Sequence, residues 1–305
     1  MPWLQLKLVT DADAADQISD RLTDLGAVAV TYEDAADQPL FEPDPGETKL
    51  WRETRVIGLF EADTQMEAII EQLRATINAP LAHLNIDPLE DKDWTRAWMD
   101  AFEPISFGQR LWIIPSWHRP SNPDAVNVIL DPGLAFGTGT HPTTALCLKW
   151  LDAHPPCNRQ VIDFGCGSGI LAVAAALLGA DHVWAVDHDP QALMATRDNA
   201  EKNGVGDKIS TCLPADLPQL ETDLMVANIL ANPLLTLAPL FAELTKKGGE
   251  IVLSGILGHQ ADQVAQRYSE WFEINPATTQ EEWVALNGTR KTALKRTEPS
   301  LSVTT

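Results

Sequence analysis

One stretch in the middle of the chain constrains the fold more than any other part. Residues 161–164 (Val-Ile-Asp-Phe) predict a short buried strand, and residues 165–169 carry a glycine at every second position. Glycine lets the backbone turn sharply and approach a ligand closely. The Ala- and Leu-rich run over 170–178 predicts a helix, and the strand predicted over 183–187 ends in an acid. This order predicts a nucleotide-binding βαβ unit, whose terminal acid accepts hydrogen bonds from ribose hydroxyls.

The glycine spacing separates two classes of ligand. The dinucleotide fingerprint has glycine at its first, third and sixth positions, but here the sixth position is Ile170 and the glycines are Gly165, Gly167 and Gly169. Asp163 lies two residues before the first glycine. Gly-x-Gly-x-Gly after such an acid resembles motif I of the class I S-adenosylmethionine-dependent methyltransferases. A carboxylate is tolerated near the cationic methionyl end of that ligand, whereas it repels a pyrophosphate. The alternative is a glycine-rich turn that binds nothing.

Composition predicts a soluble globular protein with two domains. The chain has 305 residues, of which 45% are hydrophobic and 21% charged. We find no apolar run near the length of about 18 residues that spans a membrane, and no basic-then-apolar leader. The four cysteines (147, 157, 166 and 212) have neither metal-site nor disulfide-framework spacing. We therefore expect a cytoplasmic protein without a metal.

The charge distribution bears on the partner. A formal charge of −21 argues against an enzyme that grips nucleic acid through its phosphates. Residues 1–90 carry 18 Asp and Glu against 6 Lys and Arg, a net charge of −12. Such a module can steer a basic protein toward an active site. Solubility or a salt-adapted host explains the charge equally well.

The first 90 residues predict a separate module. The alternation of apolar residues predicts strands over 3–9, 27–32, 54–60 and 84–89, with helices over 12–25 and 66–77. The order βαββαβ is that of a ferredoxin-like domain. Substrate recognition is its expected role, and a structural cap is the alternative. The apolar spacing over 90–102 predicts a helix that connects the two domains.

A second informative stretch precedes the central βαβ unit. A strand predicted over 126–130 leads into residues 131–144, which combine three glycines with Phe136 and several hydroxyl side chains. The helix predicted over 144–151 places these hydroxyls near its N-terminus, where backbone donors converge on a carboxylate such as that of S-adenosylmethionine. Ordinary N-capping by the threonines is the alternative.

The rest of the chain continues the alternation of strands and helices. Strands are predicted over 209–213, 223–227 and 250–254 and near 272 and 283, helices over 191–203, 234–244 and 258–268, and a Gly-Gly turn before residue 250. Asn228 follows the strand over 223–227, at the edge of the sheet where ligands bind in open α/β folds. The polar residues from 290 onward predict a disordered tail.

Three motifs together are specific. Gly-Leu-Ala-Phe-Gly-Thr-Gly-Thr-His-Pro-Thr-Thr at 133–144, Asp-Phe-Gly-Cys-Gly-Ser-Gly at 163–169 and Asn-Ile-Leu-Ala at 228–231 resemble the bacterial PrmA methyltransferases. These enzymes modify the eleventh protein of the large ribosomal subunit. The resemblance covers residue 1 to about residue 290.

The resemblance implies an α/β fold with four parts. These are a ferredoxin-like substrate-recognition domain (1–89), a helical linker (90–104), a Rossmann-like class I methyltransferase domain (105–290) and a disordered tail (291–305). It also implies S-adenosylmethionine as cofactor, in contact with four residues that match the family motifs, namely Thr144, Gly165, Asp187 and Asn228. The motif I pattern adds Asp163 and Gly167 as expected cofactor-binding residues.

The implied reaction is the methylation of lysine ε-amines and of an N-terminal α-amine on that ribosomal protein, free or ribosome-bound. We expect the Asn228 side-chain oxygen and the backbone carbonyl of Ile229 to accept hydrogen bonds from the amine and aim its lone pair. The alternatives are a methyltransferase for another basic protein, an RNA or a small molecule, a nicotinamide-dependent dehydrogenase, and a non-catalytic binding factor. Nothing in the sequence demands more than a monomer.

Overall fold

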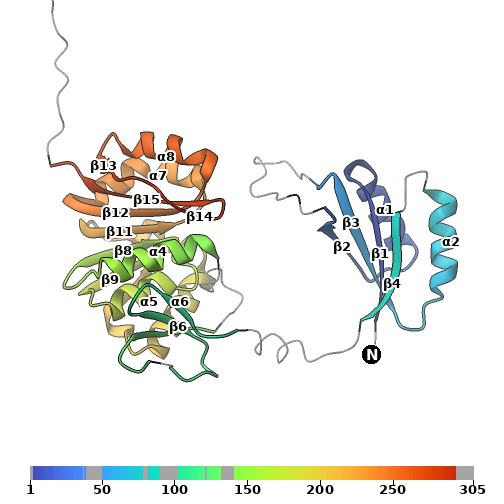
Figure 1. Cartoon of the computed structure of the whole chain (residues 1–305), viewed down its shortest axis with the longest axis horizontal. Coiled ribbons are helices and arrows are strands. Elements are labelled where there is room, and N and C mark those ends of the chain that lie inside the picture. Colours follow the sequence, from blue (N-terminus) through green and yellow to red (C-terminus); the bar gives the residue numbers. More distant parts are fainter. Residues whose placement is uncertain are drawn as a thin grey trace, which may run out of the picture. The chain divides into compact units, whose positions relative to one another are not determined.

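A computed structural model of the chain describes residues 3–36, 38, 50–77, 82–89, 102–120, 122–131 and 141–292. The chain divides into two compact units, Met1–Asp100 and Ala101–Thr305 (Figure 1). Three sequence predictions lie outside the described residues: the connecting helix except for Phe102, the segment 132–140, and the tail after residue 292. Within the described parts of the chain, no helix has both the length and the apolar character needed to cross a membrane.

The first unit has the predicted ferredoxin-like order. Its elements are β1 (Trp3–Asp11), α1 (Ala12–Asp24), β2 (Ala29–Asp34), β3 (Glu53–Glu61), α2 (Met66–Thr76) and β4 (Ala82–Leu89). The strands form an antiparallel sheet in the order β2-β3-β1-β4. Alternate residues of β1, such as Leu6 and Leu8, are buried together with Ile18 of α1 and Leu73 of α2. The two helices therefore cover the same face of the sheet.

The second unit contains a large mixed sheet (Figure 1). Its elements are β5 (Ile105–Phe107), β6 (Leu111–Ile114), β7 (Val126–Ile129), α4 (Pro142–Ala153), β8 (Gln160–Phe164), α5 (Ile170–Leu177), β9 (His182–Val186), α6 (Pro190–Lys202), η1 (Gly206–Lys208), β10 (Ile209–Cys212), η2 (Pro214–Asp216), β11 (Thr222–Asn228), α7 (Ala231–Leu244), β12 (Thr245–Leu257), η3 (Gly258–Gln260), α8 (Ala261–Tyr268), β13 (Phe272–Ile274), β14 (Thr278–Gln280) and β15 (Trp283–Arg290). The strand order in the large sheet is β10-β9-β8-β11-β12-β15-β13, and β14 also pairs with β15. The strands from β10 to β12 are parallel, and β15 is antiparallel to its neighbours.

Helices cover both faces of this sheet. Val161 and Ile162 are consecutive residues of β8, yet they belong to different apolar clusters. Val161 packs in the cluster that includes α5, and Ile162 packs in the cluster that includes α7. Successive side chains of a strand point to opposite faces, so β8 lies between two helical layers. This arrangement confirms the predicted Rossmann-like sheet.

Three details differ from the sequence predictions. Arg290, where the predicted disordered tail begins, is the last residue of β15, and the N–H of Lys291 donates to the carbonyl of Trp271 at 2.9 Å. The Gly-Gly turn predicted before residue 250 is wrong, because Gly248 and Gly249 lie inside β12. The ladder with β11 shifts register there, from Thr222↔Thr245 to Leu224↔Glu250, so the extra residues of β12 bulge out of the pairing. The strand β14 was not predicted, since three exposed or half-buried polar residues carry no apolar alternation.

Candidate active site

The glycine loop between β8 and α5 has the backbone conformation that glycine permits. Gly165, Gly167 and Gly169 have φ angles of 80°, 53° and 77°, in the left-handed region that other residues rarely adopt. The N–H groups of Gly165 and Cys166 donate to the carbonyl of Val186, the last residue of β9, at 2.7 and 3.1 Å. These bonds fix the loop against the end of the neighbouring strand.

Asp187 follows β9 directly and borders the loop. Its Oδ2 accepts a hydrogen bond from the N–H of Gly167 at 3.0 Å, and its Oδ1 accepts one from the N–H of Asp189 at 3.0 Å. The residue is 8% exposed. Two backbone donors therefore hold the carboxylate in place, and a carboxylate oxygen accepts more than one hydrogen bond. This is the environment expected of an acid that binds ribose hydroxyls.

Asn228 ends β11 and contacts the start of α4. Its Nδ2 donates to Oγ1 of Thr144 at 3.1 Å, which links positions 84 residues apart. The N-terminal end of α4 therefore lies at the carboxyl end of β11. With the amide NH₂ group directed to the threonine, the amide oxygen is left as an acceptor.

These residues surround one cavity of about 200 Å³, here named the edge pocket. The predicted site residues that line it are Thr144, Gly165, Gly167, Asp187, Asn228 and Ile229. Four further lining residues were not predicted as site residues: Cys166, Ile170, Leu171 and His188. Cys166 and His188 lie next to predicted residues along the chain, and Ile170 and Leu171 begin the helix that follows the glycine loop, which is the signal that could have found them.

Asp163 is the predicted site residue that does not line the edge pocket. Its side chain is 1% exposed, and Oδ2 accepts a hydrogen bond from the N–H of Ala172 at 3.0 Å. Its Oδ1 is buried and has no hydrogen-bond partner among the residues that the structure describes. Burial and, to a smaller extent, the negative charge of Asp187 raise the pKa of this carboxyl to about 7, against the lowering effect of the Ala172 N–H. Its contact with the cofactor stays a prediction.

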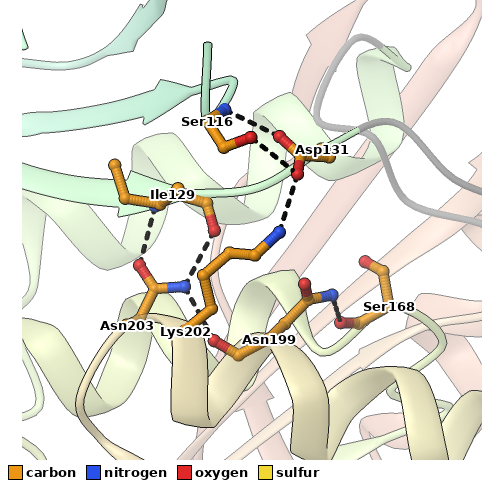
Figure 2. Close-up of polar contacts among 7 residues, drawn as sticks. All are labelled: Ser116, Ile129, Asp131, Ser168, Asn199, Lys202 and Asn203. Atoms are coloured by element: carbon orange, nitrogen blue, oxygen red, sulfur yellow. Dashed lines mark hydrogen bonds and ion pairs between the residues drawn. The ribbon is translucent and has the colours of Figure 1, made fainter. Parts of the chain in front are cut away.

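Helix α6 joins the glycine loop to the end of β7 (Figure 2). Nδ2 of Asn199 donates to the carbonyl of Ser168 at 2.8 Å. Asn203 forms two bonds with Ile129, since its Oδ1 accepts from the N–H at 2.7 Å and its Nδ2 donates to the carbonyl at 2.8 Å. Helix α6 and the residue that follows it therefore hold two segments in place. These are the end of β7, which precedes the predicted cofactor site, and the glycine loop, which forms part of it.

Lys202 completes this α6 anchor, which we define as Asn199, Lys202 and Asn203. Figure 2 shows Nζ of Lys202 beside Asp131. The distance from Nζ to Oδ2 of Asp131 is 2.7 Å. The same carboxylate accepts hydrogen bonds from the N–H and the hydroxyl of Ser116 at 2.7 and 2.9 Å. Burial opposes the charged form of Asp131, but the bonds from Lys202 and Ser116 outweigh it and lower its pKa. Asp131 is the last described residue before the Gly-rich segment 132–140.

Comparison with known proteins decides the family. The family model described as "Ribosomal protein L11 methyltransferase (PrmA)" matches residues 2–291. The chain belongs to this family. A ribosomal protein L11 methyltransferase of Marinobacter nauticus is 55% identical and is matched over 95% of this chain and 99% of that protein. One of Pseudomonas aeruginosa is 52% identical over 95% of this chain and 99% of that protein.

A solved structure extends the likeness to the fold. The crystal structure of a ribosomal protein L11 methylase from Lactobacillus delbrueckii subsp. bulgaricus is 36% identical, with a TM-score of 0.58. The match covers 62% of this chain and all of that chain. The predicted family, class I methyltransferase fold and S-adenosylmethionine-dependent activity are confirmed. The dehydrogenase alternative is set aside.

The edge pocket fits S-adenosylmethionine by the chemistry of its lining. The Asp187 carboxylate suits ribose hydroxyls, and the hydroxyl and amide of Thr144 and Asn228 suit an amino-acid group. A Cβ atom on Gly165 would lie 2.3 Å from Cγ2 of Ile229, so only glycine at this position leaves room for the Ile229 side chain in the wall of the pocket. Any larger residue at position 165 would displace that wall.

The raised pKa of Asp163 predicts a pH-dependent stability. The folded chain keeps the Asp163 carboxyl protonated at pH values above its ordinary pKa of 3.8, whereas the unfolded chain releases the proton there. The stability that the neutral carboxyl contributes is therefore lost as the pH rises through about 7. The Asn side chain of Asp163→Asn stays neutral at every pH. We therefore expect the free energy of unfolding of this variant to increase, relative to that of the wild type, as the pH rises from about 4 to about 8. Urea unfolding at a series of pH values measures this difference. A difference that stays constant with pH, as expected for the exposed control Asp198→Asn, would contradict the assignment.

The α6 anchor predicts a remote effect on cofactor binding. Lys202→Met removes the positive partner of Asp131, and we expect the affinity for S-adenosylmethionine to fall about two- to fivefold, because partly exposed ion pairs contribute little. Lys202→Arg keeps the charge and should restore most of the affinity. Isothermal titration calorimetry measures both variants beside Lys247→Met, an exposed lysine on β12. Equal affinities for the Met and Arg variants would contradict the role of the α6 anchor in cofactor binding.

Proposed function

We propose that this methyltransferase transfers methyl groups from S-adenosylmethionine to lysine ε-amines and the N-terminal α-amine of ribosomal protein L11. The observation that carries the proposal is the hydrogen bond from Asn228 to Thr144 at the wall of the edge pocket. It orients the amide so that an oxygen, and not an NH₂ group, is available to an incoming amine. The names of the relatives supply the substrate.

The amine must arrive neutral. A lysine ε-amine has a pKa of about 10.4 in water, so it loses a proton before it attacks. The apolar part of the lining, with Ile170, Leu171 and Ile229, disfavours the charged form. S-adenosylmethionine supplies a methyl group that its sulfonium already activates. The remaining task of the protein is to align the amine with that methyl group.

Two acceptors at the end of β11 suit this task. A neutral primary amine has two N–H bonds and one lone pair. The side-chain oxygen of Asn228 and the backbone carbonyl of Ile229 each accept one N–H bond, which leaves the lone pair free to point at the methyl group. Asn228, together with Thr144 and Asp187, also holds the cofactor in this proposal.

We assign substrate recognition to residues 1–89, connection to 90–104 and catalysis to 105–290. The net charge of −12 on residues 1–90 supports an acidic docking unit for a basic ribosomal protein. Phosphate contacts are not part of the proposal, because the whole chain carries a charge of −21. We place the enzyme in the cytoplasm, as a monomer that meets its substrate free or on the ribosome.

Mass spectrometry of purified ribosomal protein L11 tests the proposal. After incubation with the enzyme and S-adenosylmethionine, we expect mass increments of one methylene group per transfer, located on lysines and the N-terminus. An unchanged mass, despite cofactor binding, would contradict the substrate and favour another basic protein or a small molecule. The same assay with assembled large subunits identifies the form in which the protein is modified.

The role of Asn228 is tested in the same assay. We expect Asn228→Ala to lower the rate of methyl transfer about 100-fold, because the amine loses one of its two acceptors and its alignment. Asn232→Ala, an exposed asparagine on α7, is the matched control and should keep the wild-type rate. Calorimetry of both variants reports whether Asn228 also holds the cofactor. A full rate with unchanged cofactor affinity would disprove the assignment.

A further inference from the structure

The carbonyl of Ile229 lies beside a glycine of the next strand. In the parallel pairing of β11 with β12, Asn228 is opposite Ser254, so Ile229 and Gly255 follow as neighbours. Gly255 has a φ angle of 83°. The ladder between β12 and β15 also shifts register between Leu253 and Ile256. Gly255 therefore occupies an irregular position of β12, and such positions often adjoin functional sites.

Space at Gly255 is limited by the backbone of Ile229. A Cβ atom built on Gly255 would lie 2.3 Å from the carbonyl oxygen of Ile229, 2.8 Å from its carbonyl carbon and 3.2 Å from its nitrogen. Carbon and oxygen atoms without a bond between them do not approach to 2.3 Å. A side chain would rotate away, but these atoms belong to the peptide backbone, so any residue other than glycine must displace the carbonyl itself.

We propose that Gly255 is a positioning residue for methyl transfer, since its lack of a side chain lets the Ile229 carbonyl occupy the place from which it accepts a hydrogen bond from the substrate amine. The inference rests on the proposed function, which gives that carbonyl its role. Gly255 is not among the residues that line the edge pocket. It acts on the reaction through Ile229.

A second glycine limits Ile229 from another direction. The Cβ that Gly165 lacks would lie 2.3 Å from Cγ2 of Ile229 and 3.8 Å from its Cβ, so this contact involves the side chain. Ile229 therefore lies between a glycine that faces its side chain and a glycine that faces its carbonyl. The two contacts predict different responses to truncation of the Ile229 side chain.

Gly255→Ala tests the inference against a matched control. Gly248 also lies in β12 and has a φ angle of 79°, but an added Cβ there meets nothing within 4 Å. Gly248→Ala therefore introduces the same backbone strain without the contact. We expect Gly255→Ala to lower kcat for methylation of ribosomal protein L11 about 10- to 100-fold relative to Gly248→Ala, because a small misplacement of the acceptor is costly. The dissociation constant of S-adenosylmethionine should change less than about threefold, or about 0.7 kcal/mol.

Combination with Ile229→Ala separates the two glycines. Removal of Cγ2 should restore part of the activity of Gly165→Ala, because that clash involves the side chain. It should leave Gly255→Ala as slow as before, because that clash involves the carbonyl. Rescue of Gly255→Ala by Ile229→Ala would overturn the inference.

The remaining outcomes are also decisive. Equal kcat for Gly255→Ala and Gly248→Ala would overturn the inference alone, provided that the wild type is active. Loss of folding or of cofactor binding in Gly255→Ala would also overturn it, since the effect would then not be local to the acceptor. A wild-type enzyme that leaves ribosomal protein L11 unmodified would contradict the proposed function, and the inference with it.

Discussion

The parallel pairing of β8 with β9 on one side and β11 on the other determines the site. Parallel strands end at the same edge of a sheet, so the glycine loop, Asp187 and Asn228 meet although they are far apart in the sequence. A shift of one residue in any of these strands would turn its side chains to the opposite face. The buried apolar residues on both faces of β8 oppose such a shift. Packing of the sheet thus sets the geometry of the edge pocket.

Backbone groups, more than ion pairs, hold the pocket in shape. The glycine loop donates to Val186 and to Asp187, and α6 binds the carbonyl of Ser168 through Asn199. The carboxylate of Asp187 lines the pocket, and the carboxyl of Asp163, whose pKa is raised by burial, lies nearby. The negative charge of Asp187 favours a ligand with positive charge, and a sulfonium is such a ligand.

Local patterns in the sequence predict most elements of the fold. The glycine spacing predicts the loop, and apolar alternation predicts strands such as β1 and β11 within a few residues of their ends. The partners of a strand are harder to predict. The strand over 126–130 was predicted, but its parallel pairing with β6, in a sheet separate from the large one, follows from tertiary contacts that no local pattern contains.

Only part of the candidate site was predicted, because tertiary contacts also determine how its side chains are placed. The motif residues fall around one pocket, but the direction of each side chain depends on packing. Asp163 does not line the edge pocket, and its carboxyl accepts a hydrogen bond from the N–H of Ala172, a contact that the motif alone does not predict. The contact between Asn228 and Thr144 and the close approach of Gly255 to Ile229 join distant segments, so they required the structure.

The central claim is that the edge formed by β8, β9 and β11 binds S-adenosylmethionine. Isothermal titration calorimetry of the wild type and of Asp187→Ala tests it most directly, with the exposed Asp198→Ala as control. We expect one site per chain in the wild type, the same affinity in the control, and an affinity at least about tenfold weaker in Asp187→Ala, which lacks the acceptor for the ribose. Equal affinities in Asp187→Ala and the wild type, or binding of NADH as tight as that of S-adenosylmethionine, would contradict the claim.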